Sequence, residues 1–591
     1  MIIIFILFSF RNSINLCQPI ESGKVVEINA NSIIVNKDFT NVLVSVSDVS
    51  QYSLQDTVVL YDNKDLEYSA HTYGFNLNNW SKSRNICYQT NEQDSYRIKG
   101  TGLLYWLSNG GFNNSQVFKE QIRILLFQSN SREDIDLFIS MGIIYLLIIK
   151  SIKLCFLKQK NVLYEQITIS LILLYLAIQL AWPLSLIRVW VFYLSSYYIK
   201  DRLLRFSINL IVCAFIQPFG LSQLAYLLPL SLQFVSIFLP MKSKFIQRTL
   251  VLFTILILFN HSVSLVNILL FPILISIYRY LILLSLLLAC LPFFNPILTI
   301  LIDLTNWLFK WSMSIGVLKG NLNMMFFISF IVLYHFTVQH KKIHTTLLIL
   351  YTGAGISIFS LPLFYTLTMI NVGQGDAFLI QTPFNQTVIL IDTGSPYQYR
   401  TLKTYLDAQS INTINHLVIT HDDSDHSGNV DRLIRDFEVK EIVYKGKDII
   451  NQWIYLDYLE FNQVSKDDND TSLVYYTKLY NKSFLFLGDL SVNGEYKLIA
   501  NYPTLAIDVL KIGHHGSNTS TSDELLKHIK PRVALISVGK NNYGHPHYDV
   551  IRRLNDFFVT HFDSLNHGDV KIIITPFMCF MVNSNDELFI L

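Results

Sequence analysis

The chain has 591 residues, of which 51% are hydrophobic and only 15% are charged, and its mean hydropathy is +0.36. Soluble domains usually carry roughly 25% charged residues. This composition excludes an ordinary soluble protein and predicts that much of the chain lies in lipid. The net charge of +2 is too small to attract nucleic acid by bulk electrostatics, so a polyanionic partner would need a local patch.

The amino-terminal segment, residues 1–20, opens with the wholly apolar string MIIIFILFSF, which ends at Phe10 and is followed by Arg11. A spanning helix needs roughly 20 apolar residues, about twice this length. No small-residue cleavage site follows the string, so we expect an anchor rather than a cleaved signal peptide.

Residues 21–130 differ in residue pattern from the apolar segment before them. Apolar and polar residues alternate in KVVEINANSIIVN and NVLVSVSDV, and the alternating runs are separated by Asn, Asp and Ser clusters. This pattern predicts a small all-β domain followed by a linker. A five-stranded barrel of the OB type is one form it could take. Such a barrel could bind single-stranded nucleic acid through Tyr52, Tyr61 and Tyr68, although tyrosines on a strand face more often serve packing.

Residues 131–366 are almost continuously apolar, with short basic interruptions, and predict eight to ten membrane helices in a multi-pass membrane protein. Polar groups are costly in lipid and usually face an interior or a pathway. The candidates for a transport pathway are therefore Arg188, Gln223 and Asn267. For Arg188 the alternative is a position at a helix end, where its side chain reaches the interface.

Residues 367–591 alternate strands, loops and helices and are long enough for a complete α/β domain. Within it, Thr420–Asn429 reads THDDSDHSGN and places two imidazoles and three carboxylates within six residues, directly after an apolar strand. Imidazole and carboxylate are the ligands that hold zinc or manganese. This stretch therefore predicts a metal site.

Other apolar runs in this domain also end in polar residues: VILIDTG, the turn at residues 469–472, SFLFLGDL and DVLKIGHHGSNTS. A strand followed by a ligand-bearing loop is typical of a binuclear site at one edge of a sheet sandwich. Two ions about 3.5 to 4 Å apart lower the pKa of a bridging water and neutralise charge on a phosphoryl oxygen. We predict two divalent ions, zinc or manganese, with Asp489 as the bridging ligand. The predicted ligands are His421, Asp423, Asp425, His426, Asp489, and one or both of His514 and His515.

Further residues are expected around these ligands. Asp392 should orient a ligand, with direct binding as the alternative, and Asn469 and Ser472 stand where another ligand could be. Lys511 and Ser517 are expected to support ligands or to contact substrate. Asp425 is also expected to act in catalysis, together with His545 and His547 in YGHPH, which could hold phosphate or protonate the leaving oxygen. The alternative for the last two is a turn shaped by the proline between them.

The strings HxDxDH followed by SG, LIDTG, LGDL and GHHGS resemble the metallo-β-lactamase fold, a four-layer αββα sandwich. The particular residues in these motifs resemble those of the ComEC family of DNA internalisation proteins. The same holds for NVGQGDA at 371–377 and ISVGKNNYGHPH at 536–547. In the apolar block, PLSLIRV, PFGLSQLAYLLPLS and VNILLFP are similar to that family's competence domain. Three departures stand out: Asn371 replaces an aspartate, Asn429 replaces a glycine, and LIIKSIK stands where a polar segment is expected.

The resemblance implies a channel that carries single-stranded DNA across the cytoplasmic membrane during natural transformation, with a nuclease domain that degrades the other strand. The implied partners are DNA, the lipid bilayer, a DNA-receptor protein and a cytoplasmic helicase, and the chain could form a homodimer. Two alternatives stay open. One is a membrane-anchored phosphodiesterase that resembles phosphorylcholine esterases and has no transport role, and the other is a transporter whose soluble domain binds DNA without cutting it.

Overall fold

The computed structural model describes two large carboxy-terminal segments and several shorter stretches before them. Apart from a few isolated positions, the described residues are 20–28, 32–37, 40–48, 51–53, 55–61, 64–65, 86–99, 162–179, 184–216, 224–238, 251–258, 261–266, 295–321, 360–461 and 471–591. Residues 1–19 of the predicted anchor, Tyr68, Gln223, Asn267 and Asn469 lie outside them. The chain divides into two compact units, the second of which contains all residues from Leu318 onward.

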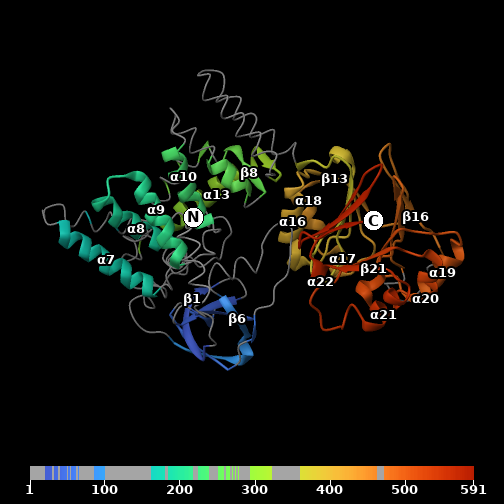
Figure 1. Cartoon of the computed structure of the whole chain (residues 1–591), viewed down its shortest axis with the longest axis horizontal. Helices are drawn as coiled ribbons and strands as arrows, with labels where there is room; N and C mark the ends of the chain where they lie inside the picture. Colours follow the sequence, from blue (N-terminus) through green and yellow to red (C-terminus); the bar gives the residue numbers. More distant parts are fainter. Residues whose placement is uncertain are drawn as a thin grey trace, which may run out of the picture. The chain divides into compact units, whose positions relative to one another are not determined.

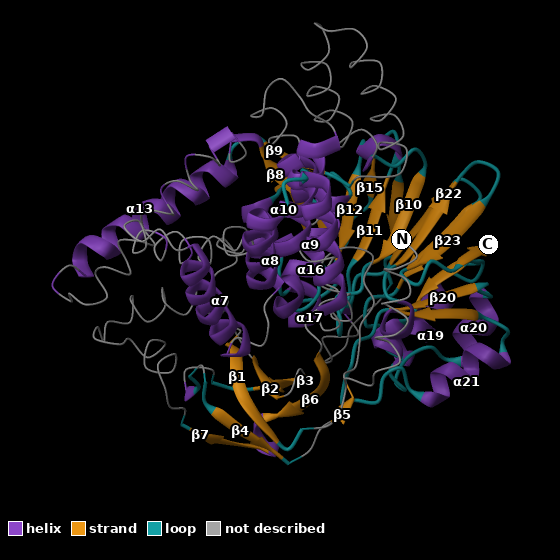
Figure 2. Cartoon of the chain, turned by 60° about the vertical axis from the view of Figure 1, so that its left-hand side comes forward, coloured by secondary structure: helices purple, strands orange, loops and turns teal. Residues whose placement is uncertain are grey.

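A seven-stranded sheet forms the amino-terminal part of the first unit (Figure 1, blue; Figure 2). Its order is β5-β6-β3-β2-β1-β4-β7, and one face of its strands is buried, including Val25, Val35, Val42, Val44 and Val58. The sequence thus correctly predicted a β domain here, whereas closure into an OB-type barrel stays a prediction. The strands are β1 (Ser22–Ile28), β2 (Ser32–Lys37), β3 (Thr40–Ser45), β4 (Thr57–Leu60), β5 (Lys64–Asp65), β6 (Ile86–Asn91) and β7 (Ser95–Ile98).

Helices follow in the apolar block, where α8 packs against α7, α9 and α10. The indole of Trp190 on α8 donates to Ser170 on α7 over 3.3 Å, and the amide of Asn209 on α9 donates to the backbone oxygen of Arg188 over 3.1 Å. The elements are α7 (Val162–Gln179), α8 (Leu184–Tyr198), α9 (Arg202–Ile216), α10 (Leu224–Phe238), β8 (Ser262–Ser264), α13 (Asn295–Ser314) and β9 (Val317–Lys319).

Within the part of the chain that the structure describes, none of the helices combines the length and the apolar character that crossing a bilayer requires. The multi-pass membrane domain therefore stays a prediction.

The second unit contains a sandwich of two sheets. The first sheet has the order β14-β13-β12-β11-β10-β22-β23-β24, and β12, β13 and β14 run parallel within it. Its strands are β10 (Tyr365–Met369), β11 (Phe378–Gln381), β12 (Val388–Ile391), β13 (Thr413–Val418), β14 (Glu438–Val443), β22 (Val570–Ile574), β23 (Cys579–Asn583) and β24 (Leu588–Ile590).

The second sheet of the sandwich has the order β15-β16-β17-β18-β19-β20-β21. The last four of these strands run parallel. Its strands are β15 (Ile449–Ile450), β16 (Tyr455–Tyr458), β17 (Tyr475–Leu479), β18 (Lys482–Phe486), β19 (Val509–Lys511), β20 (Val533–Ile536) and β21 (Thr560–Asp563).

Helices cover the outer face of each sheet (Figures 1 and 2). One apolar cluster joins the inner faces of the two sheets, a second packs α16 and α18 on the first sheet, and a third packs α19, α20 and α21 on the second. The order is therefore helix, sheet, sheet, helix, as the sequence predicted. The helices are α16 (Tyr399–Ala408), α17 (Ser424–Ser427), α18 (Val430–Asp436), α19 (Val492–Asn501), α20 (Asp523–Ile529), α21 (Tyr548–Asp556) and α22 (Ser564–His567).

The contact between the sheets can be tested at Phe378, whose ring meets Phe486 of the opposite sheet edge-on, with 5.7 Å between centroids. Because Phe378 is fully buried, Phe378→Ala should lower the free energy of unfolding by about 3–5 kcal/mol. Phe577 is 91% exposed in the β22–β23 turn, so Phe577→Ala should stay within about 0.5 kcal/mol of the parent. Denaturant titration of the two variants measures both values, and equal losses would contradict a core that is packed between the two sheets.

Candidate metal centre

The candidate centre lies where parallel strands of both sheets end. Asp392 follows β12, the THDDSDH loop follows β13, Asp489 follows β18, and the histidine pair follows β19. Because the carboxyl ends of parallel strands meet at one edge of a sheet, loops distant in sequence converge there. The sandwich therefore brings the two halves of the predicted ligand set to the same place.

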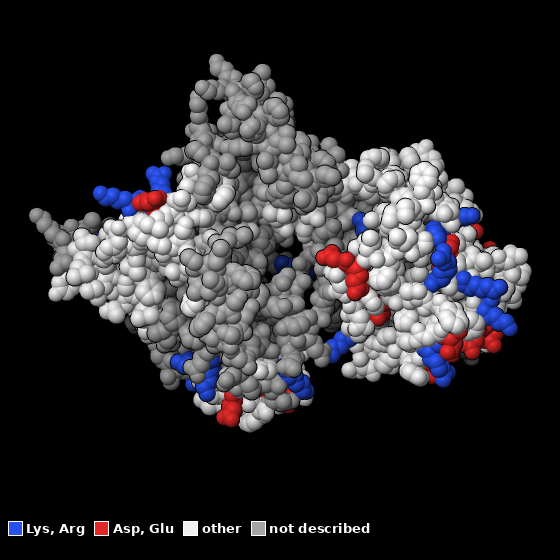
Figure 3. All heavy atoms as spheres, in the orientation of Figure 1, with Lys and Arg blue, Asp and Glu red and all other residues white. Residues whose placement is uncertain are grey.

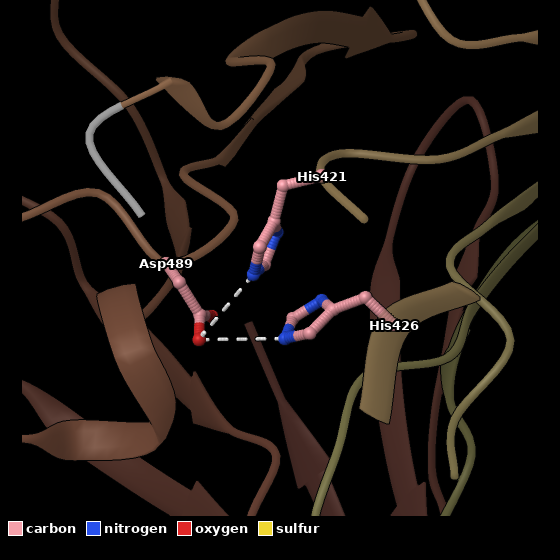
Figure 4. Close-up of side chains that lie close together, drawn as sticks. All are labelled: His421, His426 and Asp489. Carbon is pink, nitrogen blue, oxygen red and sulfur yellow. Dashed lines mark ion pairs between the residues drawn. The ribbon is translucent and has the colours of Figure 1, made fainter. Parts of the chain in front are cut away.

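Three imidazoles converge on one carboxylate. The Nε2 atoms of His426 and His515 each lie 3.4 Å from Oδ2 of Asp489, and that of His421 lies 4.0 Å from the same oxygen. Figure 4 shows His421 and His426 directing their rings at Asp489. Asp425 joins from the side, with Oδ2 3.3 Å from Nε2 of His515. Among the described residues, four overlapping groups are suited to a metal ion. Two of them are His421, His426 and Asp489, and Asp425, His426 and His515, and the other two contain Asp376.

Hydrogen bonds on the far side of two rings determine their tautomers. Nδ1 of His515 lies 2.8 Å from the carbonyl oxygen of Ser537, which can only accept, so this nitrogen carries the proton. Nδ1 of His426 lies 2.9 Å from Oδ2 of Asp392. A carboxylate or carbonyl partner of this kind leaves Nε2 with a lone pair toward the metal. Asp392 thus lies where a residue that orients a ligand is expected.

The inward Nε2 atoms of His421, His426 and His515 are buried and make no hydrogen bond, and the same holds for Oδ1 of Asp489. Leaving a buried polar atom without a partner costs about 1–3 kcal/mol. The three imidazole nitrogens converge on Oδ2 of Asp489, and a bound cation there would satisfy all three. The donor set of nitrogen and oxygen suits zinc or manganese.

The charges around the centre are unbalanced. Four carboxylates, those of Asp376, Asp392, Asp425 and Asp489, face a single buried ammonium, that of Lys511, whose Nζ pairs with Asp376 and lies 3.5 Å from Asp489. Burial opposes protonation of His515, but Asp489 and Asp376 outweigh it and raise its pKa to about 10. Burial likewise opposes protonation of His426, yet Asp489 and Asp392 raise its pKa well above the usual value. The surplus of negative charge therefore favours cations.

The backbone of the ligand loops is held in an unusual conformation. Asp392, His514 and His515 all have positive φ, at 61°, 47° and 53°. Such residues cost about 1–3 kcal/mol each and persist only where their surroundings enforce them. The side chain of Asp392 accepts from the backbone nitrogen and the hydroxyl of Thr420 over 2.8 and 2.7 Å. The loop after β12 therefore holds the loop after β13 in place.

Other predicted residues lie at the margin of the cluster. The carboxylate of Asp423 is 53% exposed and lies 3.4 Å from Nε2 of His421, and Nε2 of His514 lies 3.9 Å from Asp489. Ser472 accepts from the backbone nitrogen of Asp489 over 3.0 Å and so positions that carboxylate. Ser517 is buried with its hydroxyl 3.0 Å from that of Thr519.

The structure shows the neighbours of three residues that were expected to support ligands, to contact substrate or to act in catalysis. Lys511 is buried below the centre and donates to the carbonyl oxygen of Gly488 over 2.6 Å, so it balances carboxylates rather than reaching outward. His547 caps α21, with Nδ1 accepting from the backbone nitrogen of Asp549 over 3.2 Å. His545 faces His514, with 5.7 Å between ring centroids. Arg188, on α8, lies in the other unit.

Sequence reasoning missed Asp376. This buried carboxylate lies 3.4 Å from Nδ1 of His515 and 3.8 Å from Nδ1 of His426, in addition to its pair with Lys511. Burial raises its pKa, but Lys511 and His515 outweigh burial and lower it to about 2. The signal was present, because Asp376 lies in the loop that follows β10, the same strand-then-carboxylate pattern that identified Asp392 and Asp489.

The two asparagines that depart from the resembled family both serve the loops. Nδ2 of Asn429 donates to the carbonyl oxygens of Thr393, Gly394 and Ser395 and so joins α18 to the loop after β12. Asn371 donates its backbone nitrogen to Asp569 over 2.7 Å. Neither side chain is a member of the ligand groups.

Comparison with known proteins agrees with this geometry. Residues 370–462 match the metallo-beta-lactamase superfamily. The chain is 30% identical over 232 residues to ComE operon protein 3 of Bacillus subtilis and 33% identical over 226 residues to Recombination protein 2 of Haemophilus influenzae. It is 32% identical over 195 residues to Competence protein ComA of Neisseria gonorrhoeae.

These alignments cover 32%, 34% and 30% of this chain and 30%, 28% and 28% of the respective relatives. The matches therefore span less than a third of the relatives' length. A solved diphosphatase of the PhnP family is 13% identical, with 36% of this chain and 98% of that chain covered and a TM-score of 0.25. The chain is a homologue of these ComEC-type competence proteins and has a metallo-β-lactamase domain in its carboxy-terminal half.

Removing single groups should separate ligands from supporting residues. Asp489→Ala should abolish tight metal binding, because the three inward imidazole nitrogens converge on the carboxylate of Asp489. Asp392→Asn should lower metal affinity by about 10- to 100-fold, because it weakens the bond that orients His426 and those that hold Thr420 while leaving the ligands themselves in place. His561 lies on β21 outside the cluster, so His561→Ala should retain full metal content. Elemental analysis and competition with a chelator measure these effects, and full metal content in Asp489→Ala would refute the centre.

Metal affinity should rise with pH. Metal binding must displace the protons that the raised pKa values of His426 and His515 retain at neutral pH. Each displaced proton increases the apparent affinity by up to about tenfold per pH unit. Calorimetry at several pH values, in buffers with different heats of ionisation, counts the released protons. Binding that releases none and does not change with pH would show that both imidazoles are already neutral without metal.

Proposed function

We propose that this homologue of the competence proteins uses its carboxy-terminal domain to hydrolyse phosphodiester bonds of DNA with divalent metal ions. The observation that carries the proposal is the convergence of three inward imidazole nitrogens on Asp489 inside a surplus of carboxylates. A divalent metal bound there supplies an activated water and neutralises charge on a phosphoryl oxygen.

The residues of the chain have distinct roles in this proposal. His421, His426, His515 and Asp489 hold the metal, and Asp392 keeps His426 in the required tautomer. Asp425 has 30% of its side chain exposed, so it can touch both metal and substrate. His514 and His545 are the imidazoles at the margin, where a phosphate oxygen or a leaving group would lie.

Surface charge alone would not select DNA. In the visible face of the carboxy-terminal domain, lysine and arginine side chains are interspersed with acidic ones (Figure 3). The net charge of the chain is only +2. Bound cations would supply positive charge at the point where the phosphate must sit.

The wider role that we propose is uptake of DNA. One strand would pass through the predicted membrane block during natural transformation, and the metal centre would degrade the other. The homology to competence proteins supports this role, with single-stranded DNA, a DNA-receptor protein, a cytoplasmic helicase and a second copy of the chain as proposed partners. The competing proposal is a membrane phosphodiesterase of the phosphorylcholine-esterase type, which the metal centre would equally serve.

The Asp425→Ala variant tests both the proposed DNA hydrolysis and the proposed DNA uptake. DNA cleavage by the purified protein with manganese or zinc should fall by more than about 100-fold, because changes outside the ligand set already cost about 10- to 100-fold. Asp422→Ala is the matched control, because this neighbouring carboxylate is exposed and outside the cluster. DNA uptake is measured in cells that carry the same variants.

The outcomes distinguish the proposals. Lost cleavage with retained uptake would show that hydrolysis and transport are separable. Retention of both would refute the role of Asp425. Absence of DNA cleavage in the metal-loaded parent, combined with hydrolysis of a chromogenic phosphorylcholine ester, would favour the competing phosphodiesterase.

A further inference from the structure

We propose that Tyr543 and His545 form a stacking surface for one unpaired nucleobase beside the metal centre, so that the centre acts on single-stranded rather than paired DNA. The inference rests on the proposed function and specifies its substrate class. It depends on a series of aromatic contacts, on the hydrogen bonds that hold the loop of residues 539–547, and on the exposure of Tyr543.

Aromatic rings lead from the buried ligands to the surface. The rings of His514 and His515 lie 6.2 Å apart, those of His514 and His545 lie 5.7 Å apart, and those of His545 and Tyr543 lie 5.8 Å apart. The last pair is inclined by only 35°. Because Nε2 of His514 is 3.9 Å from Asp489, the series begins at the metal centre. The proposal places the phosphate of a nucleotide at the centre and its base at Tyr543, along this series of rings.

The loop is held internally by one side chain. Oδ1 of Asn541 accepts from the backbone nitrogens of Tyr543 and His545, both over 3.0 Å, and its Nδ2 donates to the carbonyl oxygens of Gly539 and His545 over 2.9 and 2.8 Å. All four hydrogen bonds stay within the loop. The positions of Tyr543 and His545 are consequently determined before any ligand arrives, which lowers the entropic cost of binding.

The loop is also attached to the ligand loop itself. The backbone nitrogen of His547 donates to the carbonyl oxygen of Gly516 over 2.8 Å. Gly516 has φ of +81°, and a Cβ added there would lie 2.9 Å from Cβ of Pro546. Only glycine allows this approach. The stacking surface and the histidine pair therefore move as one unit, which keeps the base at a constant distance from the reacting phosphate.

The outer ring is available to a ligand, since Tyr543 is 75% exposed. The backbone beside it is open as well, because a Cβ added at Gly544 would meet no atom within 4 Å. Stacking on an aromatic side chain contributes about 1–3 kcal/mol per base and tolerates any sequence, since every base has a π-face. A base inside a duplex already has both faces covered and must first be unstacked, at a cost of a few kcal/mol.

The test compares Tyr543→Ala and Tyr543→Phe in the metal-loaded full-length protein. With a single-stranded oligonucleotide, Tyr543→Ala should lower kcat/KM by about 5- to 150-fold, and Tyr543→Phe should stay within about threefold of the parent. Phe577→Ala is the control for loss of an exposed ring. Phe577 is 91% exposed. Its turn follows the end of β22 that pairs with Tyr365 of β10. This is the end of the sheet opposite to the one where the ligand loops begin.

A second measurement identifies stacking itself. Oligonucleotides with one abasic residue, placed at each position in turn, should reveal one position where the missing base lowers the kcat/KM of the parent. The decrease should equal the one that Tyr543→Ala causes with the intact oligonucleotide. That loss should disappear in Tyr543→Ala. A 2-aminopurine at the same position should be quenched on binding to the parent and to Tyr543→Phe, and not on binding to Tyr543→Ala.

The proposal is overturned if Tyr543→Ala cleaves single-stranded DNA as well as the parent does, or if the abasic position is equally costly in both proteins. It is also overturned if the parent prefers paired DNA. These failures leave the proposed nuclease intact, since DNA is still cut. A parent that cuts no DNA with manganese or zinc would instead refute the proposed function, and this inference with it.

Discussion

The centre depends on an imbalance of buried charge. Three carboxylates and three inward imidazole nitrogens are removed from water, Asp425 lies partly exposed beside them, and Lys511 supplies a buried ammonium that offsets part of the negative charge. Burying charge without compensation is among the most costly arrangements in a protein. Lys511 relieves part of this cost by pairing with Asp376 and Asp489. Cations at the open side of the cluster would relieve the rest, so metal binding and the stability of these loops are linked.

The sandwich holds these charged side chains together because its apolar core determines where the ligand loops begin. The inner faces of both sheets are joined by one buried cluster, in which Phe378 and Phe486 meet across the interface. The parallel strands then deliver their loops to the same edge. Strained residues such as Asp392 and His515 are retained there because rigid strands and hydrogen bonds on both sides enforce their conformation.

Roles within the cluster follow from what each side chain can reach. Asp392 and Ser472 support ligands, whereas Asp425 is partly exposed and so can contact a substrate. His545 and His547 are neighbours in sequence, yet one caps α21 while the other joins the rings that lead outward to Tyr543. The YGHPH motif therefore contains one histidine that caps a helix, His547, and one that is available for binding, His545.

The sequence by itself determined the kinds of ligand that the candidate metal centre contains. The HxDxDH string, Asp489 and the histidine pair identify a metal centre because ligand types and their positions after strands are local properties. The alternation of apolar residues likewise predicted the amino-terminal β domain. Only the tertiary structure decided that Asp376 belongs to the cluster, that Lys511 is buried beneath it, and that Asn429 joins two loops. These facts depend on contacts between segments far apart in the chain, such as Asp376 with Lys511 and His515, which a local pattern does not encode.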